Sequence, residues 1–151
     1  MKNLIYLILP FCLIVFSCSK DNDDIKTNVA ETNQLITIVQ SGDWIITDFK
    51  ENGIDGTANF EGFIFNFEED NILTATSSTS TVSGTWRISH DSASDDDPGD
   101  DTDFNIFFNS PEEFTDLTND WDVVSASASQ MVLIHISGGS VETDNLTLTK
   151  N

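Results

Sequence analysis

The stretch Gly42-Asp43-Trp44-Ile45-Ile46-Thr47-Asp48-Phe49 predicts the first strand of a small antiparallel β-barrel. A glycine lets the chain turn sharply before the strand, and a tryptophan two residues later opens an apolar-rich run. The large indole of Trp44 is therefore expected at the floor of the barrel. Gly84 and Trp86 repeat this spacing in a second predicted strand.

The rest of the chain consists of short apolar segments separated by turn residues, which predicts an all-β fold. The expected strands are 43–50, 60–68, 72–78, 82–88, 103–109, 121–127, 130–137 and a last strand around Leu146 and Leu148. Eight strands without a free edge form an up-and-down barrel. A β-sandwich is the alternative.

Alternation within these strands predicts which side chains face the interior. Phe63, Phe65 and Phe67 alternate with smaller or polar residues, so one face of their strand carries three phenyl rings. The same reasoning gives the interior residues that would contact an apolar ligand. These are Trp44, Ile46, Phe63, Phe65, Trp86, Phe104, Ile106, Met131 and Leu133.

Two short helices are expected outside the strands. Asn28 and Glu31 have capping-box spacing, and the apolar residues after them predict a helix that ends near Gly42 and caps the barrel floor. Residues 36–39 are largely β-branched, so a strand is the competing assignment there. Residues 111–114 predict a first helical turn, with Pro111 at its start and acidic residues at its positive end.

The N-terminus has the pattern of an exported lipoprotein. Lys2 and the apolar run from Leu4 to Phe16 are typical of a signal peptide, assigned to residues 1–17. Val15-Phe16-Ser17-Cys18 resembles the bacterial lipobox, which implies cleavage before Cys18 and lipidation of its thiol. Because Cys12 leaves with the signal, the mature chain keeps a single cysteine and forms no internal disulfide.

Residues 18–28 are predicted to be an acidic tether, followed by a barrel domain over 29–151. Ser19-Lys20-Asp21-Asn22-Asp23-Asp24 resembles the acidic motif that sends lipoproteins of Bacteroidetes-type bacteria to the outer face of the outer membrane. An ordinary solvated tether is the alternative, because charged linkers self-repel and extend. The expected location is the outer membrane, by a lipid anchor on Cys18, with the domain exposed at the cell surface.

The charge excludes one class of partner. The full chain carries 26 acidic and 6 basic residues, a net charge of −20, and loss of Lys2 with the signal makes it −21. Such a surface repels phosphate, so a nucleic-acid partner is not expected. Acidic residues on an exported domain otherwise serve solubility.

The sequence offers little catalytic or metal-binding chemistry. Seven aspartates between Asp91 and Asp103 surround Pro98-Gly99, but their spacing lacks the EF-hand pattern, so a solvated acidic loop is predicted and a calcium site is the alternative. His90 and His135 have no spaced partner that indicates a metal or nucleophile site. We expect His135 to be a rim histidine bound to a carbonyl. No catalytic residue, metal or cofactor is predicted, and the protein is expected not to be an enzyme.

The helix followed by Gly42-Asp43-Trp44, with the repeated Gly84-Thr85-Trp86, resembles the lipocalin family and more closely the lipocalin-like lipoproteins of Bacteroidetes. Lipocalins usually place a basic residue late in the barrel against the first tryptophan. The only arginine, Arg87, lies too early in the chain, which leaves Lys150 for this position.

The resemblance implies binding of a small apolar ligand. An eight-stranded barrel, however, is only just wide enough for its own side chains or one small ligand. The expected function is therefore an adhesion, structural or surface-complex accessory module with an envelope protein partner. A carrier of a small apolar ligand is the alternative.

Replacing the predicted lipidated cysteine tests the anchor. We expect Cys18→Ala to give a soluble or inner-membrane-retained precursor, because no thiol remains for the acyl chains, and detergent phase partitioning measures the change. Cys12→Ala, within the predicted signal, is the matched control and should partition as the wild type does. Unchanged partitioning of Cys18→Ala would contradict the lipoprotein assignment.

Overall fold

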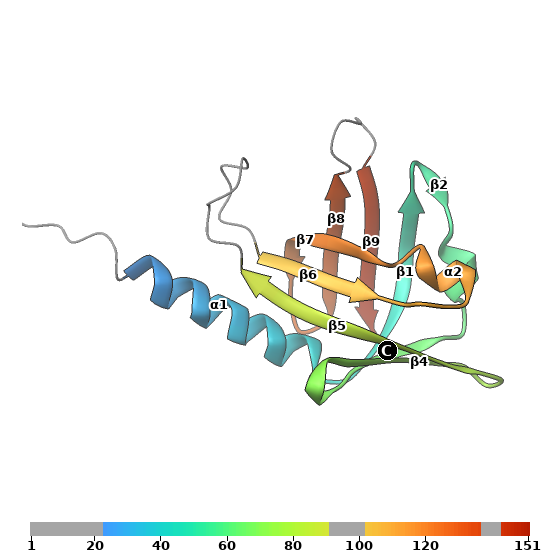
Figure 1. Cartoon of the computed structure of the whole chain (residues 1–151), viewed down its shortest axis with the longest axis horizontal. Coiled ribbons are helices and arrows are strands. Elements are labelled where there is room, and N and C mark those ends of the chain that lie inside the picture. The colour runs from blue at the N-terminus through green and yellow to red at the C-terminus, as the bar shows by residue number, and fades with distance from the viewer. Residues whose placement is uncertain (1–22, 91–101, 137–142) are drawn as a thin grey trace, which may run out of the picture.

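The computed structural model describes residues 23–90, 102–136 and 143–151, which form an antiparallel sheet of nine strands with short helices at its ends (Figure 1). The elements in chain order are α1 (Asp23–Val39), β1 (Asp43–Glu51), β2 (Ile54–Asp55), η1 (Thr57–Phe60), β3 (Ile64–Phe67), η2 (Glu69–Asn71), β4 (Ile72–Thr76), β5 (Thr81–His90), β6 (Thr102–Phe107), α2 (Glu112–Thr115), β7 (Asn119–Ala126), β8 (Gln130–Ile136) and β9 (Thr143–Lys150).

The sheet closes on itself. From β3 onward each strand pairs antiparallel with the next, and β1 pairs with β3 at its start and with β9 along its length. The two-residue β2 only adds a short hairpin to the end of β1. Eight strands therefore form a closed barrel, which confirms the predicted fold and rules out the sandwich.

Alternate side chains along the strands fill the barrel. In β9, for example, Asp144, Leu146 and Leu148 are buried while the residues between them are half-buried. Phe65 and Phe67 are buried as predicted, and Phe63 is half-buried against the same core. The apolar interior is one continuous cluster, as expected for a domain of this size.

The second predicted strand was wrong at its start. Phe60 ends the 3₁₀-helix η1, and β3 begins only at Ile64. Between them Gly62 has a φ of +82°, a backbone conformation that glycine adopts without strain, so the chain turns instead of extending. The Phe63 backbone N–H donates to the Phe60 carbonyl at 3.1 Å across this turn. Phe60 still reaches the core and is 1% exposed.

The helix before β1 differs from the prediction in its length. It begins at Asp23 rather than near Asn28, and it continues through Val39. Residues 36–39 are therefore helical, and the competing strand assignment was wrong. Leu35 and Val39 lie one turn apart on one helix face and are both buried, so burial against the barrel outweighs the β-propensity of the branched residues.

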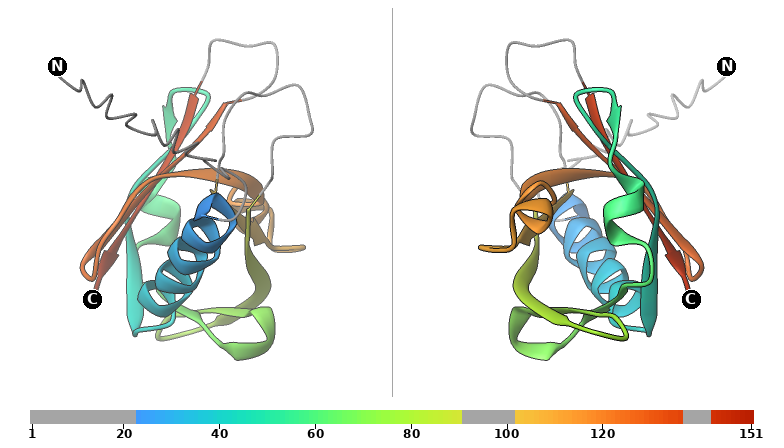
Figure 2. Two further views of the ribbon diagram at one scale, coloured as in Figure 1. Left: turned by 90° about the vertical axis from the view of Figure 1, so that its left-hand side faces the viewer. Right: turned by 90° about the vertical axis from the view of Figure 1, so that its right-hand side faces the viewer.

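Helices lie at both ends of the barrel. Seen from the α1 side, α1 lies across the ring of strands, which confirms the predicted cap (Figure 2, left). Seen from the opposite side, α2 and η1 lie on either side of the rim of the other end, with α1 visible between them (Figure 2, right). Phe60 from η1 and Phe114 from α2 are each 1% exposed, and Leu117 just after α2 is also buried. The helical turn predicted at 111–114 is confirmed as α2.

Gly84 provides a test of how tightly the barrel wall is packed. A Cβ atom there would overlap the Phe107 carbonyl oxygen and lie 2.7 Å from the Phe108 ring, and the backbone atom cannot move away cheaply. We expect Gly84→Ala to lower the free energy of unfolding by about 1–3 kcal/mol, measured by urea denaturation. Ser83→Ala, at the exposed neighbouring position, should change it by less than about 0.5 kcal/mol. Equal stability of the two variants would contradict this packing.

Candidate functional site

The residues predicted to contact an apolar ligand lie together in the barrel. Phe63 is half-buried at the edge of the core. The other eight belong to one buried cluster, contributed by strands from all around the ring: Trp44, Ile46, Phe65, Trp86, Phe104, Ile106, Met131 and Leu133. The sequence therefore located the interior correctly.

That interior is occupied by the side chains themselves. Trp44, Phe104, Met131 and Leu133 have 0% of their surface exposed, so no space that admits a water molecule adjoins them. Phe67 packs edge-on against Trp86 at 5.7 Å and lies 5.3 Å from Phe104, measured between ring centroids. Such contacts give the density of a protein core rather than that of a ligand cavity.

The barrel end beneath α2 is closed by an aromatic cluster around Phe114. The Phe114 ring lies 5.4 Å from Phe60 and 5.1 Å from Phe108, both in edge-to-face geometry. Phe63 makes a similar contact at 5.0 Å. Sequence reasoning missed this role of Phe114, although an isolated phenylalanine after two glutamates is a signal that a short helix buries one side.

Trp44 joins the other end of the barrel to α1. Its indole N–H donates to the Val39 carbonyl at 2.8 Å, and the Lys150 ammonium lies 4.8 Å from the centre of its ring. The Lys150 Nζ also donates to the Ser41 hydroxyl at 2.6 Å. The position predicted for Lys150 is confirmed, whereas the contribution of Ser41 was not foreseen.

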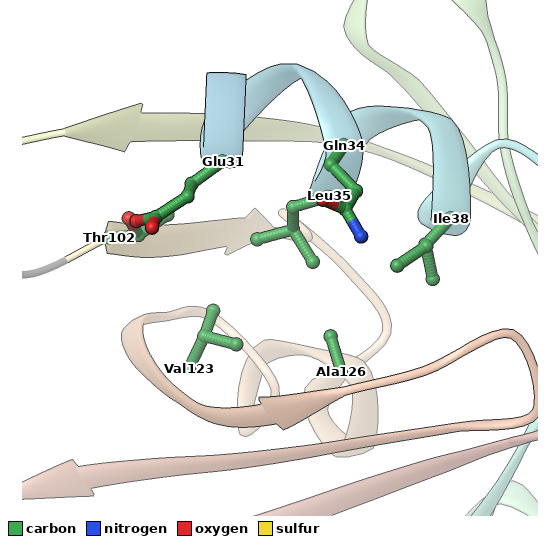
Figure 3. Close-up of a pocket in the computed structure, with 7 residues that line it drawn as sticks. All are labelled: Glu31, Gln34, Leu35, Ile38, Thr102, Val123 and Ala126. Atoms are coloured by element: carbon green, nitrogen blue, oxygen red, sulfur yellow. The ribbon is translucent and has the colours of Figure 1, made fainter. Parts of the chain in front are cut away.

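Beside α1 an open groove remains between the helix and the barrel rim (Figure 3). Leu35 and Ile38 project into it from the helix, and Val123 and Ala126 face them from β7. The groove has a volume of about 330 Å³, and its lining is completed by Glu31, Gln34 and Thr102. Sequence reasoning did not find this groove, because it depends on where the helix crosses the rim.

The polar residues at the α2 end have structural partners. His135 Nδ1 donates to the Asp120 carbonyl at 2.9 Å, which confirms the predicted rim histidine. Asp144 is buried and accepts a hydrogen bond from the Asn52 backbone N–H at 2.8 Å. Burial, with smaller contributions from Asp116 and Asp144, raises the pKa of Glu51.

Several predicted features lie outside the described residues, including Cys18, the tether up to residue 22 and most of the acidic loop, residues 91–101. Within the described ranges, no group of three or more His, Cys, Asp or Glu side chains is arranged to hold a metal ion. No helix in the same ranges is long and apolar enough to cross a membrane.

Comparison with known proteins supports the fold. No protein-family model and no curated protein matches the chain. It is similar to the crystal structure of a DUF4847 family protein from Bacteroides vulgatus ATCC 8482, with a TM-score of 0.50 and 20% sequence identity. The similarity covers 76% of this chain and 95% of that one. At this level of identity the likeness supports the barrel fold alone.

Replacing Lys150 tests the contact between the end of β9 and Trp44 at the start of β1. We expect Lys150→Met, which keeps an apolar stem but loses the ammonium, to destabilise the protein by about 0.5–1 kcal/mol, because both the cation–π contact with Trp44 and the exposed hydrogen bond to Ser41 are lost. Urea denaturation measures the change. Lys50→Met removes an exposed ion pair with Asp48 and is the matched control, expected to leave the midpoint unchanged. If both variants match the wild type, the Lys150 contact contributes nothing to stability.

Proposed function

We propose that this chain is a lipoprotein anchored in the outer membrane through Cys18, and that its lipocalin-like barrel works without catalysis through its outer surface. Its role is that of an adhesion, structural or surface-complex accessory module. The partners are the membrane, through the lipid anchor, and a protein of the cell envelope. Nucleic acid is not a partner, because the acidic surface repels phosphate.

The packing of the barrel interior is the observation that carries this proposal. Side chains with no exposed surface occupy the space where a lipocalin-type ligand would lie. The Phe114 cluster covers one barrel end, and α1 covers the other. A ligand in the interior would have to displace several packed rings, and truncating even one such ring typically costs about 3–5 kcal/mol. Binding at the outer surface requires no such rearrangement.

The proposed anchor agrees with the charge of the domain. One acyl chain binds a membrane only marginally, whereas two or more hold a protein stably, so a lipidated Cys18 suffices as the membrane attachment. Because α1 begins at Asp23, five residues, 18–22, lie between the anchor and the helix. At ~3.3–3.6 Å each they reach at most about 18 Å, which is about two Debye lengths from an anionic surface. The acidic domain then remains dispersed in front of the membrane and accessible to envelope proteins.

Native mass spectrometry of the protein isolated from its own envelope tests the interior directly. We expect the mass of the lipidated chain without a further apolar adduct, and no change in tryptophan fluorescence after organic extraction, because the rings leave no room. A stoichiometric apolar adduct whose removal and return alters the fluorescence would contradict the proposal. It would make the protein a carrier of a small apolar ligand.

A further inference from the structure

The groove between α1 and β7 leaves apolar surface uncovered. Leu35 is buried, but Ile38, Val123 and Ala126 are only partly buried, although they pack against the core from both sides of the groove. Its volume of about 330 Å³ lies at the low end of the range for small-ligand sites. At about 30 Å³ for each water-sized group, it holds roughly ten non-hydrogen atoms.

The polar groups of the groove lie at its edges. Glu31 and Thr102 face each other at one end, and the Gln34 amide lies along the helix side (Figure 3). Among the described residues that line the groove, Glu31 is the ionisable one. A ligand that covers the apolar walls therefore meets a carboxylate at one end, together with a hydroxyl and an amide that can form hydrogen bonds.

Charge selects among the ligands that fit. An anionic head group would lie against Glu31 on a chain with a net charge of −20, so both near and distant charges repel it. A purely apolar ligand would remove water from the carboxylate without replacing its hydrogen bonds. A positively charged head group avoids both costs.

We propose that this groove binds a small amphipathic cation, that is, an apolar group of a few carbons carrying an ammonium or guanidinium. The apolar part lies against Leu35, Ile38, Val123 and Ala126, and the cationic group lies at Glu31. This inference goes beyond the proposed function and does not depend on it, because the groove lies at the helix-covered end and outside the packed interior.

Three probes with the same tail and different heads test the proposal: octylammonium, 1-octanol and octanoate. Each is titrated below its micelle concentration into the chain from Ser19 onward, which contains every described element. Calorimetry gives the affinities, and amide chemical shifts locate the site. We expect octylammonium to bind about two- to five-fold more tightly than octanol, as an exposed ion pair provides, and octanoate to bind most weakly. Added salt should weaken only octylammonium binding.

Matched variants separate the contact with Glu31 from the net charge. Glu31→Gln should abolish the preference for octylammonium. Glu112→Gln removes the same charge from α2 at the opposite end of the barrel and should retain the preference. Ala126→Phe fills the groove and should abolish binding of all three probes, with Val123→Phe as the substitute if circular dichroism shows that the first variant is misfolded.

Three outcomes would overturn the inference: no binding of octylammonium at millimolar concentration, octanoate binding as tight as that of octylammonium, or shift changes in the wild type that lie away from residues 31–38 and 123–126. A groove ligand is lost in Ala126→Phe, whereas an interior ligand is not. Failure of this inference is thereby distinguished from failure of the proposed function.

Discussion

The pairing of β1 with β9 is the contact on which the rest of the structure depends. β1 pairs with β3 at its start and with β9 from Trp44 to Lys50. Its backbone groups therefore form hydrogen bonds to strands on both sides, and the sheet has no open edge there. A bulge between Ile46 and Asp48 lets the strand bend as it closes the ring. Because the sheet closes, side chains from β1, β5, β6 and β8 meet in a single interior.

Trp44 couples this closure to the helix. Its indole N–H donates to the carbonyl of Val39, the last residue of α1. The ammonium of Lys150, the last residue of β9, lies over the indole ring. The Asn151 backbone N–H donates to the Asp43 carbonyl at 3.0 Å beside it. Loss of the β1–β9 pairing would thus also free the helix, because the helix end and both closing strands meet at one buried aromatic side chain.

Local patterns predicted most of the strands, since alternation and turn residues are properties of neighbouring residues. β1, β5 and β8 begin and end within two residues of their predicted bounds. The turn at Gly62 was missed because the strand of alternating Phe63, Phe65 and Phe67 was extended back to Phe60, although Phe60 does not share their alternation. The path of the backbone shows that Phe60 enters the core from η1 instead. The interior residues followed from alternation, whereas the groove did not. A tertiary crossing brings together one face of α1, the start of β6 and the end of β7, and no pattern within a single element predicts that meeting. The lining residues are Glu31, Gln34, Leu35, Ile38, Thr102, Val123 and Ala126.

The groove follows from the geometry of a straight helix across a round barrel end. With its side chains a helix is about 10–12 Å across, and it cannot follow the curve of the rim. α1 contacts β5, so the gap is left on the β7 side, between Ile38 and the pair Val123 and Ala126. Nothing in such a crossing determines which side chains face the gap. The chain places aliphatic residues there and the exposed carboxylate of Glu31 at the edge, so the uncovered apolar area stays small. The same lining, with Glu31, Gln34 and Thr102 at its edges, makes the groove chemically unlike the cluster of apolar side chains that fills the barrel interior.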